Sequence, residues 1–248
     1  MSFAWMGENL NAAVIGATGG IGAALTQLLV RDPAIARVYG LARDPARLTG
    51  RNVIPEAINL VDTKTIAHAS QRIKDNLGQE FLDIVIIASG ILHDQGSLQP
   101  EKTWRDLRIK NLHQVFHLNA FAPVLIAKYF LPLLPRKRRA IFAALSARVG
   151  SIGDNKAGGW YAYRASKAAL NMFIRTLAIE MTRRNPQAII VGLHPGTVAT
   201  DLSGPFSARA AKVFTPDQSA SYLLQVLHKA TPNQTGSVLA WDGQTIIP

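Results

Sequence analysis

Residues 12–22 read AAVIGATGGIG, and this stretch decides the fold of the chain. Four apolar residues predict a buried strand, and the glycines after it lead into a helical pattern. A glycine-rich turn between a strand and a helix lets backbone N–H groups approach the pyrophosphate of a dinucleotide, at the positive end of the helix dipole. The spacing G-x-x-x-G-x-G is formed by Gly16, Gly20 and Gly22, with Gly19 as an extra glycine. It predicts a cofactor site early in an α/β chain.

Short apolar runs alternate with helical patterns along the rest of the chain. Strands are predicted at 12–15, 37–41, 53–58, 82–88, 140–145, 187–193 and 237–241. Helices are predicted at 21–30, 63–77, 160–182 and 217–228, and over 104–134 with a break near Asn111. This alternation predicts the α/β class: a single-domain, Rossmann-like, doubly wound parallel sheet of about seven strands with helices on both faces. We expect one domain over residues 1–248, with a flexible substrate loop at about 196–215.

Composition excludes several classes of protein. The chain has 248 residues, 48% of them hydrophobic, and no cysteine, so disulfides, thiolate metal sites and a cysteine nucleophile are excluded. Its six histidines lack metal-ligand spacing, and we expect no metal site. Residues 1–10 contain Glu8 and no long apolar run, which argues against a signal peptide. With no unbroken apolar span of membrane length, we expect a soluble cytoplasmic protein without integral membrane contact.

The net charge of +11 raises the alternative of a nucleic-acid-binding protein. The densest basic run is 136–139, between Pro135 and an apolar strand, where a helix-to-strand connection is expected. No aromatic residues are interleaved with these charges, and no nucleic-acid-binding module accompanies them. We therefore interpret the run as a solvated loop and expect no nucleic-acid partner. A basic surface also attracts phosphorylated ligands.

Tyr163 and Lys167 lie four residues apart, so one face of the predicted helix carries both side chains. A phenol has an ordinary pKa of about 10, and a nearby ammonium lowers that pKa by favouring the phenolate. Such a pair can transfer a proton during chemistry at a carbonyl or an alcohol.

The end of the second predicted strand bears on the choice of cofactor. NAD sites place an acidic residue there for the ribose 2′-hydroxyl, whereas NADP sites use an arginine for the 2′-phosphate. Here Arg43 follows the strand directly, and Asp44 precedes a proline. We therefore expect NADP(H) to be preferred over NAD(H).

Together these motifs resemble the short-chain dehydrogenase/reductase family over essentially the whole chain. The cofactor glycines, Y-x-x-x-K, an asparagine at Asn119 and P-G-x-x-x-T at 195–200 occur in the family's order. Residues 151–155 and 158–164 are similar to its C-factor and sniffer-type carbonyl reductase branch. The resemblance implies the catalytic residues Tyr163, Lys167, Asn119 and a serine, with Tyr163 as general acid/base and the hydride carried by the cofactor. The cofactor-binding residues it implies, together with those derived above, are Gly16, Thr18, Gly19, Gly20, Ile21, Gly22, Arg43, Asn59, Leu60, Ala88, Ser89, Gly90, Tyr163, Lys167, Pro195, Gly196, Val198 and Thr200.

The sequence departs from the family at several positions. Counted from Gly150, the catalytic serine position is occupied by Ala147, and we place the serine role on Ser146, with Ser151 as the other candidate. Alternate residues of a strand face opposite sides, so Ser146 needs a bulge to point toward the substrate. The family's Asn-Asn-Ala-Gly after strand four is reduced to Ile-Ala-Ser-Gly at 87–90, and its aspartate after strand three is Asn59.

Two functions follow from this sequence. The first is an NADPH-dependent oxidoreductase that acts on a small carbonyl or alcohol substrate, with Tyr163 as the acid/base. The alternative is an NADP-binding regulatory or signalling protein on the same scaffold with little turnover, suggested by Ala147 and the altered strand-four motif. The apolar helix predicted over 114–134 and the one over 160–182 pair across subunits in related folds, so we expect a homodimer or homotetramer.

Overall fold

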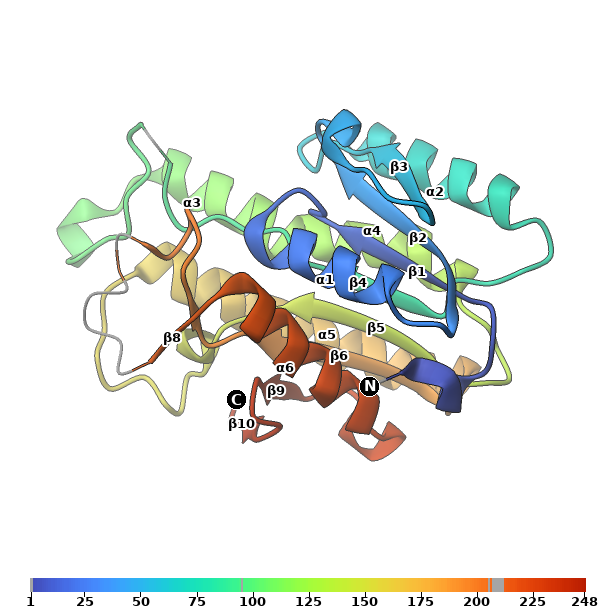
Figure 1. The fold of residues 1–248 in the computed structure, drawn as a ribbon. Coiled ribbons are helices and arrows are strands. Elements are labelled where there is room, and N and C mark those ends of the chain that lie inside the picture. Colours follow the sequence, from blue (N-terminus) through green and yellow to red (C-terminus); the bar gives the residue numbers. More distant parts are fainter. Residues whose placement is uncertain (1, 95, 205, 207–211) are drawn as a thin grey trace.

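A central, mostly parallel sheet with helices on both faces forms the protein (Figure 1). The computed structural model describes residues 2–94, 96–204, 206 and 212–248. The sheet order is β10-β9-β6-β5-β4-β1-β2-β3, and β10 is antiparallel to β9. The strands are β1 (Leu10–Ile15), β2 (Ile35–Ala42), β3 (Val53–Ala57), β4 (Ile84–Ile87), β5 (Ala140–Leu145), β6 (Ala188–His194), β9 (Val238–Ala240) and β10 (Thr245–Ile246). The strand order reverses between β1 and β4, where doubly wound folds bind ligands.

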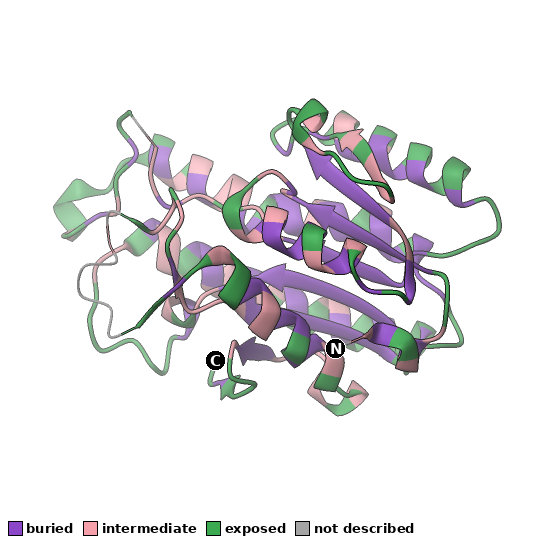
Figure 2. Ribbon diagram, in the orientation of Figure 1, coloured by how far each residue is buried: buried purple, intermediate pink, exposed green. Residues whose placement is uncertain are grey.

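The strands divide the core into two layers by alternation. In β5, Phe142 and Ala144 face one helix layer, and Ile141 and Ala143 face the other. The first layer contains α2 (Thr63–Leu77), α4 (Ala122–Phe130) and α5 (Tyr161–Arg184). The second contains α1 (Gly20–Val30) and α6 (Pro216–Lys229). The buried stripe of each helix faces the sheet in Figure 2, which is the arrangement the alternating sequence pattern predicts.

The predicted strand count is close to the structure. The sheet has eight strands because a short β10 pairs with β9 beyond the seven predicted. The ends of the predicted 196–215 loop are joined by a second, two-stranded sheet of β7 (Thr197–Val198) and β8 (Val213–Phe214). Residues 205 and 207–211 of that loop lie outside the described residues.

The predicted break in the helical region 104–134 lies at residues 107–108, three residues before Asn111, between a 3₁₀ turn (Trp104–Asp106) and α3 (Ile109–Phe116). Asn111 itself is buried inside α3. A second irregularity, which was not predicted, is a π-helical turn at His117–Phe121 between α3 and α4. The apolar run Ile109–Leu133 is the one helix in the described part of the chain that is long and apolar enough to cross a membrane, and half of its apolar stretch is buried in the protein.

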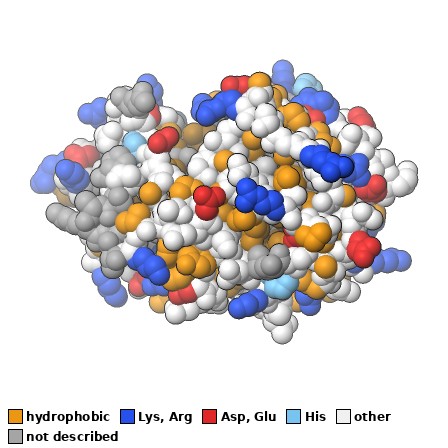
Figure 3. Space-filling view, in the orientation of Figure 1, with side chains coloured by type: hydrophobic (Ala, Val, Ile, Leu, Met, Phe, Trp, Pro, Cys, Tyr) orange, Lys and Arg blue, Asp and Glu red, His pale blue; other side chains and the backbone are white. Residues whose placement is uncertain are grey.

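Charged side chains are spread over the surface. On the face in Figure 3, Lys and Arg lie among uncharged and acidic groups. Within the basic run 136–139, Arg138 forms an ion pair with the buried Asp83. The guanidinium carbon of Arg139 lies over the ring of Trp5, 4.7 Å from the ring centre. Two of the four basic residues therefore make intramolecular contacts at the amino-terminal end of β5.

Candidate active site

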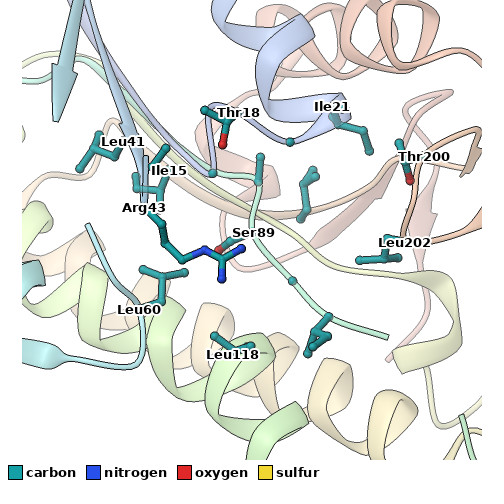
Figure 4. A pocket seen from close by; sticks show the side chains of 18 of the residues that line it. Ile15, Thr18, Ile21, Leu41, Arg43, Leu60, Ser89, Leu118, Thr200 and Leu202 are labelled. Atoms are coloured by element: carbon teal, nitrogen blue, oxygen red, sulfur yellow. The ribbon is translucent and has the colours of Figure 1, made fainter. Parts of the chain in front are cut away.

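A pocket of about 540 Å³ opens at the carboxyl ends of β1, β2 and β4, where the strand order reverses (Figure 4). Sixteen predicted site residues line it: Gly16, Thr18, Gly19, Gly20, Ile21, Arg43, Asn59, Leu60, Ala88, Ser89, Gly90, Ser146, Tyr163, Lys167, Pro195 and Thr200. Sequence reasoning missed Ile15, Leu41, Ala42, Ile58, Val61, Ile91, Leu118, Leu145, Asp201 and Leu202. Most of these directly adjoin predicted residues at strand ends, and that adjacency was the available signal.

The glycine turn is fastened to the neighbouring strand. Gly16 has φ 87°, and its N–H donates to the carbonyl of Leu41 at 2.8 Å. The carbonyl of Gly16 accepts the N–H of Gly19 at 3.0 Å. A Cβ on Gly22 would lie 2.1 Å from that same carbonyl oxygen, so Gly22 serves the close packing of α1 on the turn rather than the pocket wall.

Unpaired polar groups face the part of the pocket next to β2. Figure 4 shows the Arg43 side chain extending into the pocket beside Ser89. Arg43 is exposed and forms no ion pair with any described residue, and the buried hydroxyl of Ser89 has no hydrogen-bond partner among them. Buried hydroxyls are normally hydrogen-bonded, so these groups fit a ligand with phosphate and hydroxyl groups. The amide oxygen of Asn59 already accepts the Val61 N–H at 3.2 Å.

Tyr163 and Lys167 lie on one face of α5, as predicted, and both line the pocket. The Lys167 ammonium donates to the carbonyl of Leu145 at 2.7 Å and lies 5.7 Å from the centre of the Tyr163 ring. Burial raises the pKa of Tyr163 to about 12 and lowers the pKa of Lys167 to about 8. The prediction that Lys167 lowers the pKa of Tyr163 is therefore wrong, because burial disfavours the charged form of both side chains. Tyr163 carries its proton at neutral pH.

Asn119 lies in the π-helical turn and is fully buried. Its amide accepts the N–H of Ile91 and donates to the Ile91 carbonyl, each at 2.8 Å, and also donates to the Ser166 hydroxyl at 3.2 Å. It thus joins the segment after β4 to α5 from behind, and it does not line the pocket.

The two candidate serines differ in position. Ser146 lines the pocket, and its hydroxyl donates to the Asn171 amide oxygen at 2.6 Å, two helical turns along α5 from Tyr163. Ser151 lies outside the pocket lining, where its hydroxyl donates to the Pro248 carbonyl at 3.3 Å and accepts the Asp154 N–H at 3.0 Å. Each hydroxyl proton is therefore committed to a protein acceptor, and the assignment of Ser146 stays a prediction.

The segment after β6 forms the pocket wall beside the glycine turn. Pro195 and Thr200 line the pocket, whereas Gly196 and Val198 are not among its lining residues. The Val198 carbonyl accepts the Thr200 N–H at 2.8 Å. A Cβ on Gly20 would lie 2.8 Å from the methyl group of Thr200, so the two segments meet closely.

The family model for short chain dehydrogenase matches residues 10–211. The chain belongs to the short-chain dehydrogenase family. An uncharacterized oxidoreductase of Schizosaccharomyces pombe is 28% identical over 95% of this chain and 96% of its own. The C-signal protein of Myxococcus xanthus is 33% identical, over 57% of this chain and 81% of its own. The resemblance drawn from the motifs is thus confirmed, including its C-factor branch.

Two solved structures of carbonyl reductases share the fold of this short-chain dehydrogenase. The carbonyl reductase Sniffer of D. melanogaster superposes with a TM-score of 0.84 at 23% identity, covering 97% of this chain and 100% of that one. An NADPH-bound carbonyl reductase from chicken fatty liver gives 0.83 at 26% identity, covering 97% and 99%. The Rossmann-like, doubly wound fold predicted from the sequence is confirmed.

Proposed function

We propose that this short-chain dehydrogenase is an NADPH-dependent carbonyl reductase, with Tyr163 as the proton donor. The main observation behind this proposal is that one pocket contains Tyr163 and Lys167 together with the glycine turn and Arg43. The NADPH-bound structure with the same fold supports a nicotinamide cofactor.

The pocket residues fit a dinucleotide at both ends. The backbone of residues 16–22 and the amino end of α1 would hold the pyrophosphate, and Arg43 would pair with a 2′-phosphate. When bound, the nicotinamide supplies the hydride. Tyr163 supplies the proton to the carbonyl oxygen, and with a pKa of about 12 it is protonated at neutral pH. Lys167 lies beside it, held by the Leu145 carbonyl.

Replacing Tyr163 by Phe tests the mechanism. The variant removes the proton and leaves the ring, so NADPH binding measured by fluorescence titration should persist while turnover of a panel of aldehydes, ketones and quinones is lost. Unchanged kcat in this variant would refute the role of Tyr163. Tight NADPH binding by the wild-type protein with no oxidation on any substrate would favour the alternative, an NADP-binding regulatory or signalling protein.

We also infer a homodimer or homotetramer. A groove on the outer surface between α4 and α5 is lined by apolar residues together with Lys128, Glu180 and Arg184. Met172 and Ile179 are exposed on α5, at 65% and 49%. Light scattering that gives a monomer mass at micromolar concentration would contradict this inference.

A further inference from the structure

The first turn of α5 begins without an ordinary cap. Trp160 occupies the N-cap position with a left-handed backbone (φ 52°, ψ 43°), and its side chain makes no capping hydrogen bond. The glycines at 158 and 159 are left-handed as well. A bulky residue in this conformation is uncommon and persists where surrounding contacts impose it. Since Tyr163 is the third residue of the helix, the contacts that impose this turn also place the phenol.

Two of those contacts come from one residue, Glu101, in the segment between β4 and α3. Its backbone carbonyl accepts the Trp160 N–H at 2.6 Å, and its carboxylate Oε2 accepts the Ala162 N–H at 3.1 Å. The residue is 3% exposed, and no Lys or Arg among the described residues pairs with it. A carboxylate at this place is stabilised by the peptide dipoles at the helix amino end, which have no acidic partner in the first turn of the helix itself.

Both sides of this contact are braced. Asp106 accepts the two backbone N–H groups that directly follow Glu101, at 3.1 and 3.0 Å, and so fixes the backbone that carries the carboxylate. On the other side, Arg164 donates to the carbonyls of both left-handed glycines, at 3.2 and 3.0 Å. The Trp160 ring meets the Tyr163 ring edge-on, with centroids 6.1 Å apart. A shift of the turn would therefore move Tyr163 and the ring packed on it.

A role in stabilising the helix end does not by itself explain the buried carboxylate of Glu101. The second carboxylate oxygen, Oε1, is buried with no hydrogen-bond partner among the described residues. A buried oxygen without a hydrogen-bond partner destabilises a fold. Groups that lower stability in this way are found mostly at functional sites.

We propose that Glu101 is a positioning residue for Tyr163. It holds the first turn of α5 in its left-handed entry through its carbonyl and its carboxylate, and so sets where the phenol stands in the pocket. The proposal rests on the proposed function, in which Tyr163 donates the proton.

Three variants test it. Glu101→Ala removes the acceptor for the Ala162 N–H, Glu101→Gln keeps an acceptor oxygen without the charge, and Asp94→Ala is the matched control. Asp94 lies in the same segment and accepts two backbone N–H groups, at 2.8 Å from Gly96 and 3.0 Å from Leu98, but makes no bond to α5. Should Glu101→Ala fail to fold, Glu101→Asp replaces it.

We expect kcat to fall by about 10- to 100-fold in Glu101→Ala, because misplacement by about 1 Å can cost about 100-fold in rate. The Kd for NADPH should stay unchanged, and hydrogen exchange of residues 160–166, measured by mass spectrometry, should accelerate. Glu101→Gln should keep most of kcat and the protection, and Asp94→Ala should behave as wild type. Wild-type kcat in Glu101→Ala, or an equal loss in Glu101→Gln, overturns the proposal. If the wild-type protein turns nothing over, the proposed function fails, and unchanged exchange in Glu101→Ala would separately overturn the positioning role.

Discussion

Replacing Gly22 by Ala should disturb the glycine turn from inside α1. The added Cβ would lie 2.1 Å from the Gly16 carbonyl oxygen and 2.9 Å from the Gly16 carbonyl carbon. An ordinary contact requires a retreat of about 1 Å. That carbonyl accepts the Gly19 N–H, and the Gly16 N–H is bonded to Leu41, so neither side of the turn can move without losing a hydrogen bond.

The magnitude follows from three effects. Overpacking costs about 1–3 kcal/mol, and a lost backbone hydrogen bond costs about 1 kcal/mol. Alanine in a helix returns about 1 kcal/mol relative to glycine. The net loss is about 2 kcal/mol, which lowers Tm by about 4–8 °C in a chain of this size. Because the displaced backbone is the proposed phosphate cradle, the Kd for NADPH should rise by at least about tenfold, equivalent to about 1.4 kcal/mol.

Thermal unfolding and fluorescence titration with NADPH measure both effects. For the stability measurement, Gly19→Ala is the matched control, because its Cβ would stand 3.4 Å from the same oxygen and its backbone (φ −77°, ψ 161°) suits alanine. We expect this control to lose less than about 1 kcal/mol of stability. If Gly22→Ala has the Tm and the NADPH Kd of the wild type, the argument that the turn has no room for a Cβ at Gly22 is refuted.

Four further predictions concern the chemistry, cofactor binding and stability. Ala147→Ser restores a hydroxyl at the family's serine position and should raise kcat by about tenfold or more, since such a donor is worth about 2.7–4 kcal/mol; no gain, together with a large loss in Ser146→Ala, would assign the role to Ser146. Arg43→Ala should raise the Kd of NADPH by about 10- to 100-fold and leave that of NADH unchanged, because hydrogen bonds to charged groups are worth about 1.5–3 kcal/mol; equal losses for both would remove Arg43 from the 2′-phosphate. For pH, kcat/KM in the reducing direction should decline above about pH 8, where Lys167 loses its proton while Tyr163, with a pKa of about 12, keeps its own; a flat profile to pH 10 would contradict this. The lowered lysine pKa means that the unfolded chain binds more protons, so this group's contribution to stability should rise between about pH 8 and its ordinary pKa of 10.5, as pH-dependent denaturant unfolding can measure.

Local patterns were sufficient to predict most of the fold. The glycine turn, the alternation of strands and helices, and the i,i+4 pair each depend on residues close together in sequence. The structure brings the glycine turn and the Tyr163–Lys167 pair together in one pocket. The boundaries of α5 were predicted within two residues, because its apolar stripe is regular.

What sequence patterns missed depends on contacts between distant residues. The direction of the Tyr163 pKa shift depends on how deeply the pocket buries both partners, which spacing does not reveal. Glu101 contacts α5 from about sixty positions earlier, and no local motif marks it. The π-helical turn at His117–Phe121 was missed because it keeps the same residue types as the helix around it.

That turn also constrains how the chain can vary in length. A π-helical turn contains one residue more than an α-helical turn, and each residue of an α-helix advances the face by about 100°. Deleting a single residue within 117–121 would therefore restore a regular α-helix and leave α4 in nearly its present orientation, so Ile126 and Phe130 would stay in the core. The side chains inside the turn would be redirected instead, and Asn119 would lose its contacts with the backbone after β4. We expect homologous chains that lack one residue in this five-residue window to keep the packing of α4 and to lack these asparagine contacts.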